Sequence, residues 1–157
     1  LGHIGKDLVS LLKPFNCRIL VNDIIDQEDY CQSENLIELG KDELINQADI
    51  ISIHTPLTSD TQDLVDAEFL IKMKNSAILI NTARGGIVNE NDLKQALLSG
   101  EIRAAALDVY DSEPPTDLEL LSLPNLFCTP HIGGNSAEAV LAMGRSSITH
   151  IRSYLKH

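Results

Sequence analysis

The stretch Ser76-Ala-Ile-Leu-Ile-Asn-Thr-Ala-Arg-Gly-Gly86 decides how the chain folds. Residues 77–80 are a short apolar run that stops abruptly at polar residues and two glycines. Such a run predicts a strand buried on both faces, opening into a polar loop. In open parallel sheets, ligands bind beyond the carboxyl ends of the strands, so Arg84 is well placed to hold an anionic substrate. An arginine that only caps nearby carbonyl groups is the alternative, and this stretch alone leaves both open.

The composition is that of one globular domain. A length of 157 residues suffices for one sizeable core, and 43% apolar with 22% charged residues argue against disorder. The net charge of -11 repels a phosphate backbone, so we expect no nucleic-acid partner. No apolar run approaches the roughly 20 residues that span a bilayer, and no signal-peptide pattern is present, so we expect no membrane partner and a cytoplasmic location. The 3 cysteines are widely spaced and predict neither disulfides nor a metal site.

The first residues predict a nucleotide-binding turn. Gly2-His3-Ile4-Gly5 leads directly into a helix whose apolar residues recur at helical spacing. Backbone N–H groups of such a turn can approach a pyrophosphate, although tight packing of the helix start would also explain the glycines. Asp23 follows a strand about 20 residues beyond them, where a carboxylate binds a ribose diol. No Arg or Lys stands beside Asp23 to neutralise a 2′-phosphate, which favours NAD over NADP.

Strands and helices alternate along the chain. We expect strands at residues 18–21, 49–53, 77–80, 103–107 and 126–128. We expect helices over residues 41–48, after an N-cap at Asp66, from an N-cap at Asn89 to Gly100, and after a capping pair of Asn135 and Glu138. Residues 26–39 are acidic and irregular and predict a surface loop with some local structure. The alternation predicts an α/β fold with a doubly wound parallel Rossmann sheet.

Polar or ionisable residues follow strand after strand: Asp23, His54-Thr55, Arg84, Asp108 and His131. In a parallel sheet these ends share one edge, so we expect the groups to converge on one crevice. A histidine moves a proton near neutral pH, a carboxylate orients it, and an arginine binds a carboxylate by two parallel hydrogen bonds. Glu113 is held in a stiff loop by the prolines that follow it. Singly, His131 could be an ordinary loop histidine and Glu113 a surface acid, but together with Arg84 they predict a catalytic site.

Six groups of residues occur in order and at suitable spacing. They are Gly2-His3-Ile4-Gly5, Asp23, His54-Thr-Pro-Leu-Thr58, Ile80-Asn-Thr-Ala-Arg-Gly-Gly86, Leu107-Asp-Val-Tyr110 with Glu113-Pro114, and Thr129-Pro-His-Ile-Gly133. This series resembles the NAD-dependent D-isomer-specific 2-hydroxyacid dehydrogenases over nearly the whole chain.

The resemblance implies a role for each matching residue. Arg84 would bind the carboxylate and carbonyl of a 2-oxo acid, and His131 would be the general acid in reduction and the base in oxidation, hydrogen-bonded to Glu113. Hydride would pass between C2 of the substrate and NAD. The implied cofactor-binding residues are Gly2, His3, Ile4, Gly5, Asp23, Thr55, Pro56, Thr61, Thr82, Ala83, Asp108 and Gly133. Among these, Asp23 would take the adenosine ribose and Asp108 would lie near the carboxamide.

The resemblance also implies that part of the enzyme lies outside the chain. The dinucleotide fingerprint includes a strand and a further glycine before Leu1, so we expect residues 1–157 to be an NAD-binding domain that lacks its first strand and its substrate domain. We expect little turnover from the chain alone and a homodimer in the full-length protein. Two alternatives stay open: an NAD(H)-responsive binding module resembling the corepressor relatives of these enzymes, and a remnant that has lost catalysis.

Overall fold

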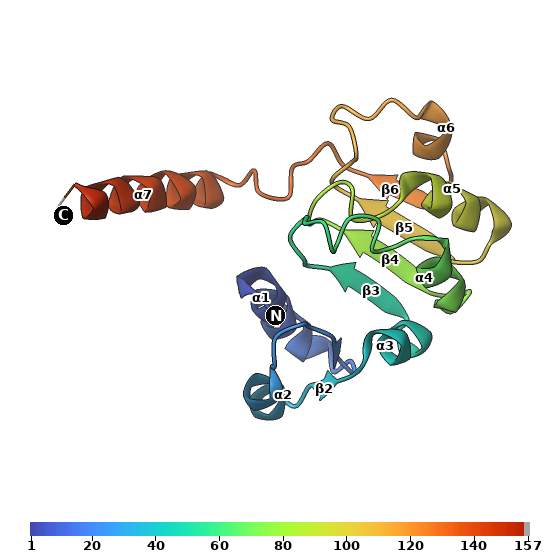
Figure 1. Cartoon of the computed structure of the whole chain (residues 1–157), viewed down its shortest axis with the longest axis horizontal. Helices are drawn as coiled ribbons and strands as arrows, with labels where there is room; N and C mark the ends of the chain where they lie inside the picture. Colours follow the sequence, from blue (N-terminus) through green and yellow to red (C-terminus); the bar gives the residue numbers. More distant parts are fainter. Residues whose placement is uncertain (156–157) are drawn as a thin grey trace.

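A parallel four-stranded sheet forms the body of the molecule in the computed structural model, which describes residues 1–155 (Figure 1). In chain order the elements are α1 (His3–Leu12), the 3-10 helix η1 (Lys13–Phe15), β1 (Leu20–Val21), α2 (Glu28–Glu34), β2 (Ile37–Glu38), α3 (Lys41–Gln47), β3 (Ile50–Ile53), α4 (Ala67–Lys72), β4 (Ile78–Asn81), α5 (Glu90–Ser99), β5 (Ala104–Leu107), α6 (Leu118–Leu121), β6 (Leu126–Cys128) and α7 (Ala137–Tyr154). The alternation and the parallel pairing confirm the predicted α/β fold with a Rossmann-type sheet.

The sheet brings consecutive strand ends to one edge. Strands β3, β4, β5 and β6 pair in that order, and every pair is parallel. Ile78 of β4 lies between Ile50 of β3 and Ala104 of β5. The loops that carry Arg84 and His131 therefore leave the same edge. Strands β1 and β2 form a separate parallel pair, and no ladder joins this pair to β3 within residues 1–155.

The core lies between one face of the sheet and the helices α4 and α5, which pack against each other (Figure 1). Leu79 of β4 and Leu93 of α5 are fully buried in it. Ile78 and Ile80 point to the opposite face and are only half-buried. The prediction that residues 77–80 are buried on both faces was therefore wrong, because the described helices α4 and α5 cover only one of them.

Side chains and glycines end the helices where local sequence patterns predict. Asp66 accepts a hydrogen bond from the Phe69 N–H at 2.9 Å and caps α4. Asn89 accepts one from the Asp92 N–H at 3.1 Å and caps α5. Gly100 ends α5 with a φ of 75°, a left-handed conformation that glycine adopts without strain.

Two predicted segments differ in the structure. The loop predicted over residues 26–39 contains more than some local structure, since it holds the helix α2 and the strand β2. Strand β2 forms because it pairs with β1, a tertiary contact that local composition does not reveal. Helix α7 is capped by Ser136, whose hydroxyl accepts from the Ala139 N–H at 3.1 Å, and not by the predicted pair of Asn135 and Glu138.

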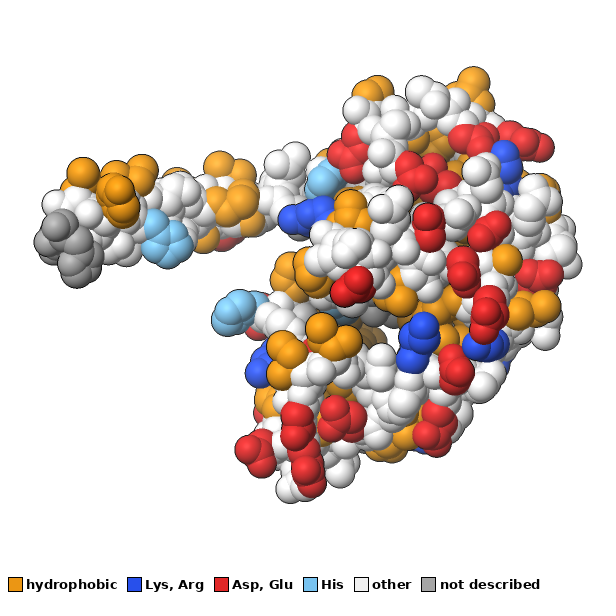
Figure 2. All heavy atoms as spheres, in the orientation of Figure 1, with side chains coloured by type: hydrophobic (Ala, Val, Ile, Leu, Met, Phe, Trp, Pro, Cys, Tyr) orange, Lys and Arg blue, Asp and Glu red, His pale blue; other side chains and the backbone are white. Residues whose placement is uncertain are grey.

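Helix α7 extends away from the body of the molecule (Figure 1). Hydrophobic side chains stand along it, while acidic side chains are spread over the body (Figure 2). The apolar residues of α7 are exposed, and Val140, Ile148 and Ile151 each keep more than half of their surface accessible. Among residues 1–155, each helix is too short or too polar to cross a membrane.

Candidate active site

Arg84 lies in a tight loop that the buried side chain of Asn81 shapes. The Asn81 Oδ1 accepts from the Ala83 N–H at 3.0 Å, and its Nδ2 donates to the Arg84 carbonyl at 2.9 Å. Because the side chain is 1% exposed and both ends of its amide are satisfied, it fixes the loop. The Arg84 side chain is exposed, and within residues 1–155 no carboxylate forms an ion pair with it. The sequence assigned Asn81 no role. Its position directly after the apolar run of residues 77–80 was the one feature that could have pointed to it.

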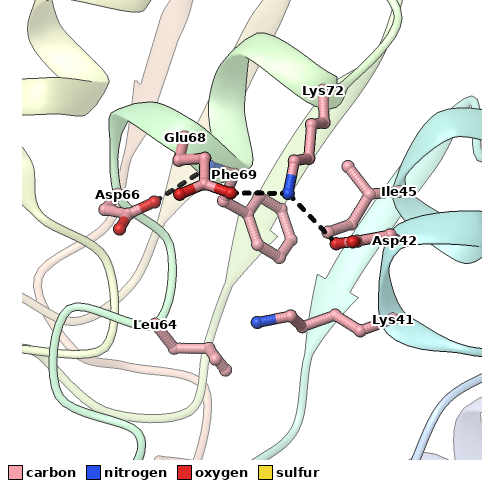
Figure 3. Close-up of a pocket in the computed structure, with 8 residues that line it drawn as sticks. All are labelled: Lys41, Asp42, Ile45, Leu64, Asp66, Glu68, Phe69 and Lys72. Atoms are coloured by element: carbon pink, nitrogen blue, oxygen red, sulfur yellow. Dashed lines mark hydrogen bonds and ion pairs between the residues drawn. The ribbon is translucent and has the colours of Figure 1, made fainter.

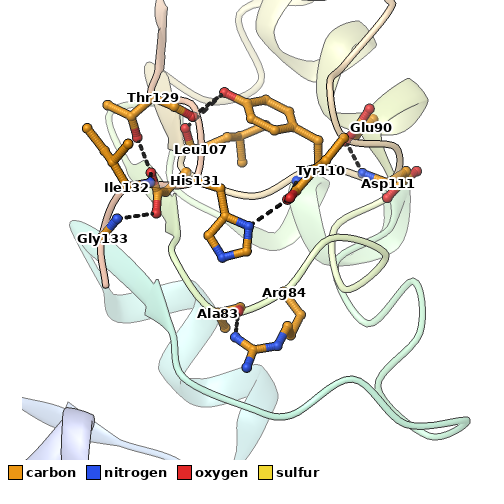
Figure 4. Close-up of polar contacts among 12 residues, drawn as sticks. Ala83, Arg84, Glu90, Leu107, Tyr110, Asp111, Thr129, His131, Ile132 and Gly133 are labelled. Atoms are coloured by element: carbon orange, nitrogen blue, oxygen red, sulfur yellow. Dashed lines mark hydrogen bonds and ion pairs between the residues drawn. The ribbon is translucent and has the colours of Figure 1, made fainter. Parts of the chain in front are cut away.

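Glu113 and His131 form the pair that the sequence predicts. The Nδ1 of His131 lies 2.7 Å from Oε2 of Glu113, and the Tyr110 N–H donates to Oε1 of Glu113 at 3.2 Å. The hydrogen bond with His131, and then the one with Tyr110, hold the pKa of Glu113 below its ordinary value. An ionised carboxylate can only accept, so Nδ1 carries the proton. The other ring nitrogen, Nε2, points toward the region of Arg84 (Figure 4).

Asp108 fastens the loop of His131 to the end of β5. Its carboxylate accepts from the Thr129 hydroxyl, from the Ile132 N–H at 2.9 Å and from the Gly133 N–H at 2.8 Å (Figure 4). Burial acts to raise the pKa of Asp108, but these three hydrogen bonds together hold it below its ordinary value. His131 has a φ of 53°, a left-handed conformation that side chains rarely adopt. The bonds to Asp108 on both sides of His131 keep it in this conformation.

Tyr110 joins the ends of β5 and β6 from within. Its hydroxyl lies 3.2 Å from the Leu107 carbonyl oxygen and 3.0 Å from the Thr129 carbonyl oxygen. Burial, followed by a contact with Cys128, raises the pKa of this hydroxyl, so it stays a donor. Tyr110 and Thr129 appear in the motif series, but the sequence assigned neither a role, because the contact between them joins residues 19 positions apart.

The predicted pyrophosphate turn lies at the start of helix α1. Helix α1 begins at His3, its N-cap residue Gly2 provides no side-chain cap, and its first turn contains no acidic residue. The N–H groups of this turn, which includes His3 and Ile4, are therefore not neutralised by the helix itself. A second feature fits a ligand: Thr55 Oγ1 is buried and has no hydrogen-bond partner among the described residues. A nucleotide at the strand ends would supply one.

Asp23 lies in the loop that follows β1, apart from Glu113 and His131. Its Oδ1 accepts from the Ile25 N–H at 3.0 Å, and its Oδ2 contacts the amino group of Leu1. The structure therefore does not join Asp23 or the glycine turn to Glu113 and His131 by hydrogen bonds.

The remaining predicted cofactor residues lie in loops at the strand ends. Thr61 closes its own loop, since its hydroxyl accepts from the Thr58 N–H at 2.8 Å and donates to the Pro56 carbonyl at 2.6 Å. Thr82 is exposed beside Ala83 in the loop after β4. A Cβ on Gly133 would lie 2.9 Å from Asp108 Oδ2, so this glycine makes room for the carboxylate.

A small pocket of about 90 Å³ lies between α3 and α4 (Figure 3). It is lined by Lys41, Asp42, Ile45, Leu64, Asp66, Glu68, Phe69 and Lys72. The Lys72 ammonium lies 2.7 Å from Glu68 Oε1 and 3.3 Å from Asp42 Oδ1, so its charge is neutralised within the protein. None of the predicted site residues lines this pocket, and we assign it no chemistry.

Comparison with known proteins shows the family of the chain. Residues 1–133 match the family model described as D-isomer specific 2-hydroxyacid dehydrogenase, NAD binding domain. The chain is 40% identical over 158 residues to the D-3-phosphoglycerate dehydrogenase of Methanocaldococcus jannaschii, covering 99% of this chain and 30% of that protein. It is 38% identical over 157 residues to the glycerate dehydrogenase of Methylorubrum extorquens, covering 98% of this chain and 48% of that protein.

Solved structures with NAD bound are also similar. The D-lactate dehydrogenase of Aquifex aeolicus, complexed with NAD and lactic acid, aligns with a TM-score of 0.89 at 27% identity over 99% of this chain and 51% of that chain. The enzyme of Lactobacillus delbrueckii ssp. bulgaricus in its NAD-complexed form aligns with a TM-score of 0.89 at 30% identity, covering 99% of this chain and 51% of that chain. The chain thus spans about half or less of the length of these relatives.

Proposed function

Because the chain belongs to the NAD-binding domain family of the D-isomer-specific 2-hydroxyacid dehydrogenases, we propose that it serves an enzyme that interconverts a 2-oxo acid and a D-2-hydroxy acid. One observation carries the proposal. The hydrogen-bonded pair of Glu113 and His131 lies at the same sheet edge as the exposed Arg84. This arrangement combines a proton donor with an anchor for a carboxylate.

Each residue of this group has one task in the proposal. Arg84 binds the substrate carboxylate by two parallel hydrogen bonds. Its exposed guanidinium donates from Nη1 to the Ala83 carbonyl and keeps further N–H donors for this task. His131 gives a proton from Nε2 to the carbonyl oxygen in reduction and removes it in oxidation. Glu113 keeps the Nδ1 proton in place and stabilises the positive charge of the ring. Bound NADH supplies the hydride to C2 of the substrate, and NAD⁺ accepts it in the reverse direction.

The residues that would hold NAD lie on α1 and at the strand ends. The turn of Gly2 to Gly5 would bind the pyrophosphate through N–H groups at the start of α1, and Asp23 would bind the adenosine ribose. The unpartnered Thr55 hydroxyl would face the nucleotide. Residues Pro56, Thr61, Thr82, Ala83 and Gly133 would complete the lining of the crevice, while Asp108 would hold the loop of His131 beside it.

The proposal extends to parts of the enzyme outside residues 1–157. The chain covers 30% and 48% of the two curated relatives, which supports a substrate domain contributed by other residues. That domain would exclude water and help to select the acid. We further propose that the complete enzyme is cytoplasmic and, from the family resemblance, that it is a homodimer.

The test is the replacement His131→Asn in the complete enzyme. Loss of the proton donor should lower kcat for 2-oxo acid reduction by roughly a hundredfold or more. The Kd for NADH, measured by fluorescence titration, should stay the same because His131 does not hold the nucleotide. His150→Asn, an exposed site on α7, is the matched control and should keep wild-type activity. Undiminished turnover in His131→Asn would overturn the proposal, and so would a wild-type enzyme that binds NADH without reducing any 2-oxo acid.

A further inference from the structure

Two carboxylates outside the predicted site connect the loop of Arg84 to the loop of Glu113. The Gly86 N–H donates to Asp111 Oδ1 at 2.7 Å, and the Asp111 N–H donates to Glu90 Oε1 at 2.8 Å. Asp111 is thus held through its side chain by the loop after β4 and through its main chain by the first residue of α5. The close-up in Figure 4 shows Glu90 beside Asp111. We call these two hydrogen bonds the Asp111 bridge.

The backbone at Gly85 lets the two loops approach each other closely. A Cβ at this position would lie 1.8 Å from the Tyr110 carbonyl oxygen, which no side chain can do. The next residue, Gly86, has a φ of 78°, and its N–H is the donor to Asp111. The loop that carries Arg84 is therefore packed directly on the main chain of residues 110–111.

Residues 110–111 also support the acid-base pair. The Tyr110 N–H donates to Glu113 Oε1, and the other oxygen of Glu113 bonds to His131. Glu90 is half-buried, and burial raises the pKa of its carboxyl while the hydrogen bond from Asp111 acts in the opposite direction. Because the Glu90 carboxylate is partly removed from water, its hydrogen bond from the Asp111 N–H holds it in place.

We infer that Asp111 and Glu90 are positioning residues, which set the place of Arg84 relative to the Glu113–His131 pair. The inference rests on the proposed function. Arg84 holds the substrate at one end and His131 protonates it at the other, so a shift of about 1 Å between their loops would separate the carbonyl oxygen from its proton donor. The Asp111 bridge resists such a shift because it joins the two loops directly.

Substitutions in the complete enzyme test the inference by kinetics. Asp111→Ala removes the acceptor for Gly86 and should lower kcat/KM for the 2-oxo acid roughly five- to tenfold, with the Kd for NADH unchanged. Asp111→Asn keeps Oδ1 as an acceptor and should restore most of the activity. Asp26→Ala is the matched control, since Asp26 Oδ1 accepts from the Glu28 N–H at 2.8 Å on an exposed surface, and it should retain wild-type kinetics. Equal kinetics in Asp111→Ala and wild type would overturn the inference.

Hydrogen exchange provides a readout that does not need turnover. Asp111→Ala should speed amide exchange at residues 84–87 as well as at 109–113, because the bridge couples both loops. Faster exchange at 109–113 alone would show a local role and overturn the inference, whereas Asp26→Ala should change neither segment. A wild-type enzyme without turnover would remove the proposed function while the exchange result still decides whether the bridge couples the loops. If the wild-type enzyme is active but Asp111→Ala leaves exchange at residues 84–87 unchanged, the inference is overturned and the proposed function stands.

Discussion

Replacement of Asp108 by Asn tests whether this residue holds the loop of His131 or binds the carboxamide of NAD. The carboxylate accepts hydrogen bonds through both oxygens from the loop that presents His131. An Asn side chain has one oxygen and one NH₂ group, so either the Gly133 N–H or the donors at Oδ1 lose their acceptor. We therefore expect Asp108→Asn to loosen the loop of His131.

The size of the effect follows from the burial and the bonds. Asp108 is 5% exposed, and leaving one buried backbone N–H unsatisfied costs about 1–3 kcal/mol. The remaining hydrogen bonds lose the help of the negative charge, which brings the total to about 2–4 kcal/mol of the free energy of unfolding. Thr129→Val removes only the hydroxyl donor and should cost about 1 kcal/mol. The smaller loss in Thr129→Val serves as an internal reference.

Urea unfolding and NADH titration measure the two roles separately. We expect the urea midpoint of Asp108→Asn to fall by roughly 1–2 M, with that of Thr129→Val falling clearly less. The Kd for NADH, measured at urea concentrations well below the midpoint, should change little, because the carboxylate is bound by the loop that carries His131. An unchanged midpoint together with much weaker NADH binding would refute this reasoning. Asp108 would then act chiefly on the carboxamide, as the family resemblance implies.

Three further predictions test the packing and the charge of the site. Gly85→Ala places a Cβ against the Tyr110 carbonyl oxygen, so it should lower kcat/KM by roughly tenfold or more in steady-state assays, and wild-type kinetics would contradict the close packing. Leu79→Ala, at a fully buried core position, should cost about 2–5 kcal/mol in urea unfolding, and a loss below about 1 kcal/mol would show that the core refills the space. The lowered pKa of Glu113 means that its hydrogen bond with His131 stabilises the fold above the ordinary carboxyl pKa of about 4.3 and that this is lost as the pH falls through the lowered value. The difference in urea midpoint between wild type and Glu113→Gln should therefore shrink at acidic pH as Glu113 becomes protonated, and a difference that grows on acidification would reverse the assignment.

Capping residues in the sequence predicted the ends of helices correctly where the cap is a neighbouring residue. Asn89 and Gly100 mark the two ends of α5, because a cap acts within one turn of the helix. The prediction of Asn135 as the N-cap of α7 was wrong. Ser136, the next residue, is an equally good capping residue, and its hydroxyl accepts the hydrogen bond from the Ala139 N–H. The strand β2 was missed because its two residues form a strand only through pairing with β1.

The sequence by itself determined the class of fold, the strand ends that carry Arg84, Asp108 and His131, and the family of the chain. These depend on the order of apolar runs and polar ends, which is written along the chain. Only the tertiary structure decided that Asp108 binds the loop of His131 and that Asp111 joins two loops. In those hydrogen bonds the partners are more than 20 residues apart, so they meet only when the register of the sheet and the path of each loop are fixed.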